Sequence, residues 1–442
     1  MRLAPRDREI LLLAVPALGA LVCEPLFLLV DAGIVGSLGR APLAGLGVAG
    51  AVLATAVNLF VFLAYGTTAS VARTLGAGDL RAALARGVDG LWLAAGLGVG
   101  AALVTGLGAP LVIGVFHVGG PVGDQAVAYL RASAPGVPGM LVVLAATGVL
   151  RGLQDTRTPL AVAGVGAVVN AVLNLALVHG AGLGITGSGL GTALTQTGMG
   201  VVTAVVVARG ARRHGAPLRP HLSGIRAGGL AGVPLLVRTL ALRATLLITT
   251  YAAGRLGDVA LAAHTVVSNL WTLLALTLDA LAIAAQALTG RSLGAGDVAG
   301  VRAATARMVR WGVGGGVVLG ALLLGLRTLL EPLFTPDPAV RRAMAAALVV
   351  AAVMQPLAGY VFVLDGVLIG AGDGRYLAVT ATVQLLVYLP LAAAVIEVAP
   401  QGTAGLVWLW IAFAGGWMAV RAVFLGRRAR GSAWLVTGDG TR

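Results

Sequence analysis

The chain is dominated by apolar stretches that are long enough to cross a lipid bilayer and are separated by short polar turns. About 20 consecutive apolar residues suffice for a helix to span the hydrocarbon core. Such stretches recur twelve times in 442 residues, of which 58% are hydrophobic and only 11% are charged. A soluble domain usually carries about 25% charged residues, so a soluble fold is excluded. The sequence therefore predicts an all-α polytopic membrane protein with twelve transmembrane helices.

The length and the acidic residues of the first predicted span argue against a cleavable signal peptide. We place the spans at residues 10–36, 43–71, 87–114, 125–149, 159–179, 185–208, 228–252, 259–289, 305–330, 339–369, 376–397 and 403–425. The first is too long for the apolar region of a signal peptide, and it contains Glu24 and Asp31. We therefore interpret it as a retained membrane helix.

The basic residues are all Arg, and their distribution predicts the orientation. With the N-terminus in the cytoplasm and each Arg near the end of a span assigned to the nearer side, 23 of the 31 Arg (among them Arg2 and Arg442) fall on the cytoplasmic side, six fall outside, and Arg238 and Arg243 lie deep within a span. This split follows the positive-inside rule and predicts a cell-membrane protein with both termini in the cytoplasm. The positive charge is thus explained without a nucleic acid partner. Because there is no Lys, a P-loop ATPase is excluded, and uphill transport should use an ion gradient.

The two halves of the chain resemble each other at one constant offset, with no gaps. The matching segments are 75–79 with 293–297, 148–157 with 366–375, 15–16 with 233–234, and 36–43 with 254–261. The repeat predicts two pseudo-symmetric six-helix bundles, at residues 1–208 and 227–442, joined by a polar cytoplasmic linker at 209–226. Parallel repeats of this kind are typical of transporters that open alternately to the two sides of the membrane. A channel is the other class of membrane protein that we considered.

Asp31 is the clearest candidate for a functional residue, because its repeat-equivalent is the uncharged Thr249. A charge at the centre of a membrane helix costs about 2.5–3.5 kcal/mol on insertion scales, so a carboxylate there is a functional candidate by default. An apolar environment favours the neutral form of a carboxyl group, so Asp31 could bind and release a proton near neutral pH. Hydrogen bonding to neighbouring helices is the alternative, purely structural role.

Further polar residues recur at helical spacing in the first half. Asn170 and Asn174 lie four residues apart in the fifth span, and Thr192 and Gln196 repeat that spacing in the sixth. We expect these four side chains to line a polar pocket with Asp31, although ordinary interhelical hydrogen bonding would use the same residues. Glu24 lies seven residues before Asp31 on the same helix face and is a candidate second carboxylate of the cavity.

Two prolines and three charged residues complete the candidates. Pro16 and Pro25 permit a kink in the first span, which could act as a gate. In the second half we hypothesise that Arg238 and Asp365 pair, and we expect a structural or gating role for them and for Asp279.

No catalytic or metal-binding pattern stands out, since paired catalytic groups are absent and His spacing does not suit a metal. We therefore expect no enzymatic activity, no metal and no cofactor beyond a coupling ion, and we keep an intramembrane enzyme as an unsupported alternative.

Several motifs resemble the multidrug and toxic compound extrusion (MATE) family, and within it the DinF-like branch. They are Glu24-Pro25-Leu26 with residues 30–39, the segment 72–79, Arg151-Gly152-Leu153-Gln154-Asp155-Thr156-Arg157-Thr158-Pro159-Leu160, residues 236–240, 262–264 and 364–371. The resemblance spans nearly the whole chain. It implies a monomeric twelve-helix antiporter in the bilayer that exports organic, often cationic, drug-like compounds against H⁺ or Na⁺.

The resemblance also implies an ion site at Asp31, Asn170, Asn174 and Thr192. Asn174 stands where related sites often carry a second Asp, and Phe27 stands where a Tyr can occur. Because both changes remove oxygen ligands, we favour H⁺ over Na⁺ as the coupling ion. The alternatives are a Na⁺-coupled exporter and a flippase or exporter of a lipid-linked or metabolite substrate.

Overall fold

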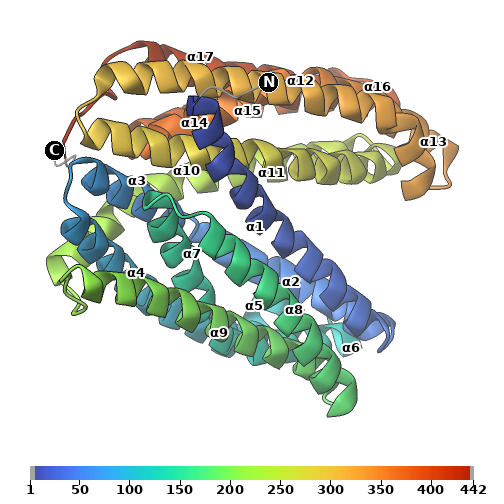
Figure 1. Ribbon diagram of the computed structural model, residues 1–442. Helices are drawn as coiled ribbons and strands as arrows, with labels where there is room; N and C mark the ends of the chain where they lie inside the picture. Colours follow the sequence, from blue (N-terminus) through green and yellow to red (C-terminus); the bar gives the residue numbers. More distant parts are fainter. Residues whose placement is uncertain (1–4, 439–442) are drawn as a thin grey trace. The chain divides into compact units, whose positions relative to one another are not determined.

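The computed structural model describes residues 5–438, so Arg2 and Arg442 lie outside the described residues. Every regular element in this range is a helix (Figure 1). The first half contains α1 (Pro5–Gly36), α2 (Arg40–Leu59), α3 (Phe62–Gly76), α4 (Leu80–Leu107), α5 (Ala109–Val115), α6 (Gly120–Ser133), α7 (Val137–Gly152), α8 (Arg157–Leu175) and α9 (Gly184–Arg213). The second half contains α10 (Leu222–Arg255), α11 (Asp258–Gly294), α12 (Val298–Phe334), α13 (Pro338–Val353), α14 (Gln355–Gly370), α15 (Gly374–Val398), α16 (Thr403–Trp410) and α17 (Met418–Arg430).

The helices confirm the predicted membrane fold. Within residues 5–438, eleven helices are long and apolar enough to cross a membrane. The pair α13 and α14, bent by 51° at their junction, passes the same test jointly, which gives twelve spans when the pair is counted as one. Two short π-helical segments, at Ala176–Gly180 and Ile411–Trp417, extend α8 and join α16 to α17.

The helices of the two halves begin at equivalent places. α4 begins at Leu80 and α12 at Val298, and α7 begins at Val137 and α14 at Gln355. In each pair, the two starting residues are related by the same offset as the repeated sequence segments. The helix boundaries thus repeat together with the sequence, as expected for two copies of one six-helix bundle.

Contacts within the chain define two compact units. The N-terminal unit comprises residues 15–232, and the C-terminal unit comprises residues 5–14 and 233–438. Helix α1 therefore contributes its first turns to the C-terminal unit and the remainder, including Asp31, to the N-terminal unit.

Two buried carboxylates explain where these boundaries fall. Asp7, which is 4% exposed, accepts hydrogen bonds from the Arg307 guanidinium and, at 2.8 Å, from the indole N–H of Trp311, which fastens the start of α1 to α12. Asp89 of α4 accepts a hydrogen bond of 3.0 Å from the backbone N–H of His221. The segment that joins the halves therefore packs in the N-terminal unit.

This joining segment is shorter than the polar linker placed at 209–226 from the sequence. α9 continues to Arg213 and α10 begins at Leu222, so only residues 214–221 lie outside the helices. The last turn of α9 contains Arg212 and Arg213, and positive side chains there are stabilised by the helix dipole. Polarity alone therefore did not mark the end of the helix.

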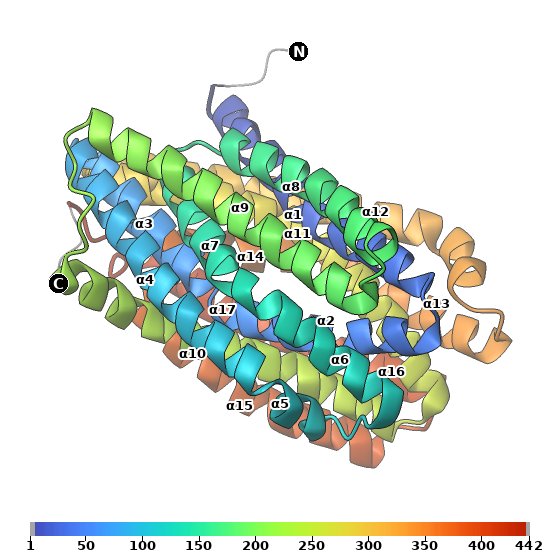
Figure 2. The same cartoon turned by 90° about the horizontal axis from the view of Figure 1, so that it is seen from below.

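A central helix organises each unit. α7 packs against α3, α4 and α9 in the N-terminal unit (Figure 2), and α14 packs against α11, α12 and α17 in the C-terminal unit (Figure 1). A Cβ on Gly200 of α9 would lie 2.9 Å from the Cα of Gly139, and a Cβ on Gly312 of α12 would lie 2.6 Å from the carbonyl oxygen of Gly359. Small residues thus allow the close backbone approach on which membrane helix packing depends.

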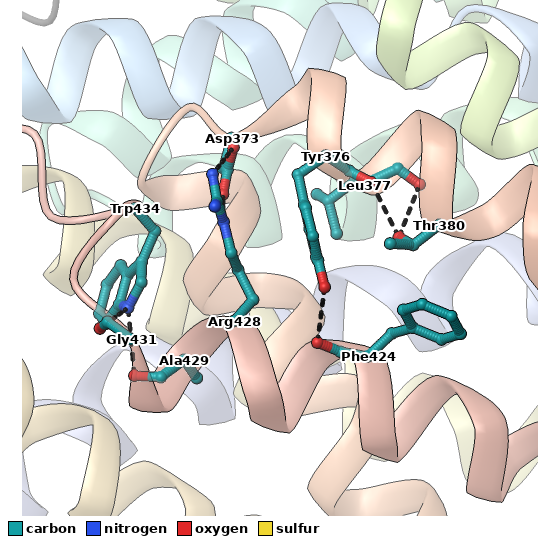
Figure 3. Close-up of polar contacts among 9 residues, drawn as sticks. All are labelled: Asp373, Tyr376, Leu377, Thr380, Phe424, Arg428, Ala429, Gly431 and Trp434. Carbon is teal, nitrogen blue, oxygen red and sulfur yellow. Dashed lines mark hydrogen bonds and ion pairs between the residues drawn. The ribbon is translucent and has the colours of Figure 1, made fainter.

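The repeated segments 148–157 and 366–375 each contain an Asp at the equivalent position, and these two carboxylates have different partners. Asp155 accepts a hydrogen bond of 3.0 Å from the backbone N–H of Thr158 at the start of α8. Asp373 instead accepts from the Nε of Arg428 at 2.6 Å and from its Nη2 at 3.0 Å (Figure 3). The Arg428 guanidinium also lies 4.6 Å from the centre of the Tyr376 ring. This contact fastens α17 to the first turn of α15.

The C-terminal unit buries a cluster of charged side chains. Arg238 donates to both carboxylate oxygens of Asp365, so the pair hypothesised from the sequence is in direct contact. Arg421, which is 5% exposed, lies 3.6 Å from Asp365 and 4.9 Å from the centre of the Trp417 ring. Asp279, which is half-buried, interacts electrostatically with Arg421. Opposite charges therefore balance within the cluster.

We expect Arg238→Ala and Asp365→Ala each to lower the free energy of unfolding by about 3 kcal/mol, because each leaves a buried charge without its main partner. The double variant should lose less than the sum of the two single losses. Unfolding of the purified variants in detergent measures these values, with exposed Arg243→Ala on the same helix as the control. Additive losses would show that the pair makes no coupled contribution.

Candidate functional site

Asp31 is buried by the part of α1 that belongs to the N-terminal unit. Asp31, Ile34 and Val35 lie on one face of the helix, at positions three and four residues apart, and they are 1%, 8% and 0% exposed. The apolar members of this face hold α1 against its neighbours. The carboxyl group is thereby placed inside the bundle, away from lipid.

Helix α8 presents two amide side chains to this carboxyl group. Asn170 and Asn174 lie one turn apart and are 1% and 0% exposed. The Nδ2 of Asn174 donates to Oδ1 of Asp31 at 2.8 Å and to Oδ1 of Asn170 at 3.1 Å. The two amides therefore form a chain that ends on Asp31.

Helices α6 and α9 supply hydroxyl groups. Ser188 of α9 donates to Oδ1 of Asp31 at 2.5 Å. Tyr129 of α6 donates to Oδ2 of Asp31 at 3.4 Å, and its hydroxyl lies 3.4 Å from Oγ1 of Thr192. Thr192 thus reaches the site through Tyr129 rather than directly.

A glycine permits this close packing of α8 and α9. A Cβ on Gly191 would collide with Oδ1 of Asn174, so a side chain at this point would displace the amide from its present position. We call the cluster of Asp31, Tyr129, Asn170, Asn174, Ser188 and Thr192 the Asp31 network.

The hydrogen bonds that Asp31 accepts come from uncharged donors. They are one amide N–H and two hydroxyl groups, so the carboxylate is solvated by dipoles and not by a cation. Two polar atoms of the network, Oδ1 of Asn174 and Nδ2 of Asn170, are buried without a hydrogen-bond partner. The amides therefore retain unused donor and acceptor capacity beside the carboxyl group.

Six residues of the first half were predicted to line the pocket. Four of them belong to the Asp31 network, namely Asp31, Asn170, Asn174 and Thr192. Gln196 and Glu24 do not. Gln196 is half-buried on α9, and its side chain makes no hydrogen bond to the Asp31 network. Glu24 is exposed on α1 and likewise does not join it.

Helix α1 continues through Pro16 and Pro25 as one α-helix. Within the described residues, no three His, Cys, Asp or Glu side chains could hold a metal ion.

Ser188 and Tyr129 were not predicted from the sequence. Ser188 lies one turn before Thr192, so the i, i+4 spacing that selected Thr192 and Gln196 could have found it in the other direction. Tyr129 offered no such signal, because a Tyr in an apolar helix is usually a core residue.

The equivalent positions in the C-terminal unit hold no such network. Thr249 replaces Asp31, and Tyr388 replaces Asn170, with their hydroxyl groups 2.6 Å apart. Ala392, Leu406 and Trp410 stand at the positions of Asn174, Ser188 and Thr192. Trp410 packs edge-on against Phe413 with ring centres 5.6 Å apart. Aromatic and aliphatic side chains therefore fill the space that polar groups occupy in the N-terminal unit.

Comparisons with known proteins agree with this architecture. The family model MatE matches the chain twice, over residues 16–176 and 234–394, and these two ranges are related by the offset of the internal repeat. Protein DETOXIFICATION 44, chloroplastic, of Arabidopsis thaliana is 32% identical over 384 residues, which cover 84% of this chain and 73% of that protein. DNA damage-inducible protein F of Escherichia coli is 30% identical over 305 residues, covering 67% and 65%.

A solved structure shares the whole fold. The Vibrio cholerae MATE transporter VcmN in its bent form superimposes with a TM-score of 0.86 at 20% identity, covering 96% of this chain and 97% of that one. The resemblance to the DinF-like branch agrees with the second relative above. Because the family model covers equivalent regions of both halves, the chain belongs to the MatE family of multidrug and toxic compound extrusion transporters.

Proposed function

We propose that this chain is a secondary active antiporter that exports organic, often cationic, compounds in exchange for H⁺, with Asp31 as the proton-binding residue. One observation carries the proposal. Asp31 is a membrane-embedded carboxyl group that is 1% exposed and is held by uncharged hydrogen-bond donors. Such a group is costly to keep ionised in the membrane, and its protonation can be coupled to a conformational change.

The chemistry of the Asp31 network favours H⁺ over Na⁺. A hard cation is bound by several oxygen atoms that act as acceptors. Around Asp31, Ser188 and Tyr129 direct their O–H groups toward the carboxylate, and Asn174 directs its N–H₂ group there. These donors suit a bare carboxylate that alternates with its protonated form. Na⁺ would require Asn174 to turn and present Oδ1.

The unused amide atoms give the network two arrangements. When Asp31 is ionised, Asn174 donates to it. When Asp31 is protonated, its O–H becomes a donor, and Oδ1 of Asn174, now without a partner, can accept from it after the amide turns. The proton would thereby change how α8 holds α1, and Pro16 and Pro25 give α1 the capacity to bend.

The lipid-linked or metabolite alternative has less support. It would favour basic side chains in the transport path, and Arg238 is instead engaged by Asp365 in a buried ion pair.

We further propose a non-enzymatic monomer in the cell membrane with both termini in the cytoplasm, as the distribution of Arg suggests.

We expect Asp31→Asn to abolish ΔpH-driven substrate transport in proteoliposomes, because an amide cannot exchange a proton. The matched control is Thr249→Val, which alters the equivalent position of the other unit and should retain transport. Imposed ΔpH and ΔNa⁺ are compared for each protein. Substrate transport by Asp31→Asn at the wild-type rate would rule out the role given to Asp31, and transport driven by ΔNa⁺ alone would establish the Na⁺ alternative.

Ser188→Ala should move the alkaline limb of the pH–transport profile to higher pH by about one unit, because the lost donor stabilises only the ionised carboxylate. Tyr129→Phe should act in the same direction but less, since its hydroxyl lies farther from Asp31, at 3.4 Å. Initial transport rates between pH 5 and 9 provide the measurement. A shift to lower pH would mean that Ser188 does not donate to the ionised form.

A further inference from the structure

The C-terminal unit contains a pocket where the start of α1 meets α11 and α12, with a volume of about 290 Å³. Residues from these three helices line it, among them Arg6, Glu9, Ile10, Arg291, Ser292 and Arg307. All of its lining residues belong to the C-terminal unit, and none of them belongs to the Asp31 network. The pocket is therefore a separate feature, which the proposed antiport function leaves unexplained.

The pocket lies at the boundary between the membrane and water. Arg6 precedes the first predicted span, and Arg291 follows the eighth. Ile10 and Leu288, which are 2% and 7% exposed, contribute apolar side chains at the ends of the same two spans. The distribution of Arg predicts that this boundary is the cytoplasmic one. The phosphate groups of anionic lipids lie at this level, and basic pockets between membrane helices are suited to them.

The three Arg side chains of the pocket differ in how firmly they are held. Arg307 donates to both carboxylate oxygens of the buried Asp7, so its charge is balanced there. Arg291 lies 3.7 Å from Glu9, and both side chains are about half exposed. An exposed pair of this kind adds little stability. The Arg6 side chain makes no hydrogen bond or ion pair with another residue of the range 5–438. Arg6 and Arg291 can therefore both turn to an anion.

The other polar groups of the pocket are compatible with an anionic ligand. Oδ1 of Asp297 accepts a hydrogen bond of 2.7 Å from the backbone N–H of Gly300 and caps the start of α12. The positive end of the helix dipole therefore offsets the charge of this carboxylate. Ser292 is half-buried and adds a hydroxyl group that can donate to a phosphate oxygen. The walls thus offer two guanidinium groups and a hydroxyl group, which are typical partners of phosphate in proteins.

The equivalent positions of the N-terminal unit have different charges. By the offset of the repeat, Gly224 stands at the position of Arg6, and Asp89 stands at the position of Arg307. A Cβ on Gly224 would collide with Oδ2 of Asp89, so an acidic side chain occupies the space beside this glycine. The shared architecture therefore does not require a basic pocket, whereas a ligand that binds the C-terminal unit accounts for it.

We propose that this pocket binds the phosphate group of an anionic ligand, with Arg6 and Arg291 as its cationic partners and Ser292 as a hydroxyl donor. An anionic phospholipid presents such a phosphate at this depth, with its acyl chains toward the apolar wall. Because Arg6 lies on α1 and Arg291 on α11, a phosphate between them adds to the Asp7 contact that fastens the start of α1. The site goes beyond the proposed antiport function and does not depend on it.

The test titrates dioctanoyl phosphatidylglycerol into the purified full-length protein in non-ionic detergent. The unfolding temperature, which rises when a ligand binds the folded state, is compared with that of the same protein without the lipid. Arg6→Gln should weaken binding about tenfold, because a charge-assisted contact is lost. The matched control is Arg8→Gln, which removes the same charge from an exposed residue about 200° around α1 and should leave the affinity unchanged. Glu9→Gln should strengthen binding about threefold, because a competing carboxylate beside Arg291 is removed.

Two further ligands identify the source of the phosphate. Dioctanoyl phosphatidylcholine, whose choline group balances the phosphate charge, should bind about tenfold more weakly than dioctanoyl phosphatidylglycerol. Glycerol 3-phosphate carries the phosphate without acyl chains. If it binds more weakly than dioctanoyl phosphatidylglycerol, the site takes a lipid, and if it binds equally well, the site takes a soluble phosphate compound.

Three results would overturn the phosphate site. They are equal affinities for the two lipids, equal effects of Arg6→Gln and Arg8→Gln, and weaker binding by Glu9→Gln. The last result would mean that Glu9 holds the pocket together and does not compete with the ligand. The antiport proposal would stand in each case, because the transport assay of Asp31→Asn tests it separately.

Discussion

The protein depends on one constraint, which is that a carboxyl group must be accommodated inside a membrane bundle. Asp31 is the group concerned, and the surrounding helices are arranged to supply its hydrogen bonds. Asn174, Ser188 and Tyr129 approach from three different helices, and Gly191 leaves the space in which Asn174 fits. Because an unsatisfied polar group in hydrocarbon is costly, these donors must be in place whenever Asp31 is ionised. A change in its protonation therefore affects the packing of α1 against α6, α8 and α9 together.

The two halves share a framework but differ in their interiors. Equivalent helices begin at equivalent positions of the repeat and pack around the central helices α7 and α14. The N-terminal unit contains the polar network, whereas the C-terminal unit contains an aromatic cluster around Trp410 and Phe413 and the balanced pair of Arg238 and Asp365. A charge that is paired permanently has little freedom to exchange protons. This difference between the two units supports different functions for them, in which the N-terminal unit binds the coupling ion and the C-terminal unit provides a stable bundle.

Much of this organisation could be predicted from the sequence, because hydrophobic length and the repeat report directly on membrane spans. Asp31 was identifiable because its equivalent, Thr249, is uncharged. Asn170 and Asn174 were identifiable from their helical spacing. Gln196 was expected in the same pocket but does not join it, since helical spacing places a residue on a face without determining which neighbour that face meets. Tyr129 could not have been found, because its role depends on the contact between α6 and α1, which are distant in the chain.

The most direct test of the central claim is the proton release that accompanies substrate binding to the purified protein in weakly buffered detergent solution. If Asp31 exchanges its proton for substrate, a saturating organic cation should release about one proton per chain from wild type and none from Asp31→Asn. The pH should be set where Asp31 of the free protein is protonated. Undiminished proton release from Asp31→Asn would contradict the account and place the coupling group elsewhere in the protein.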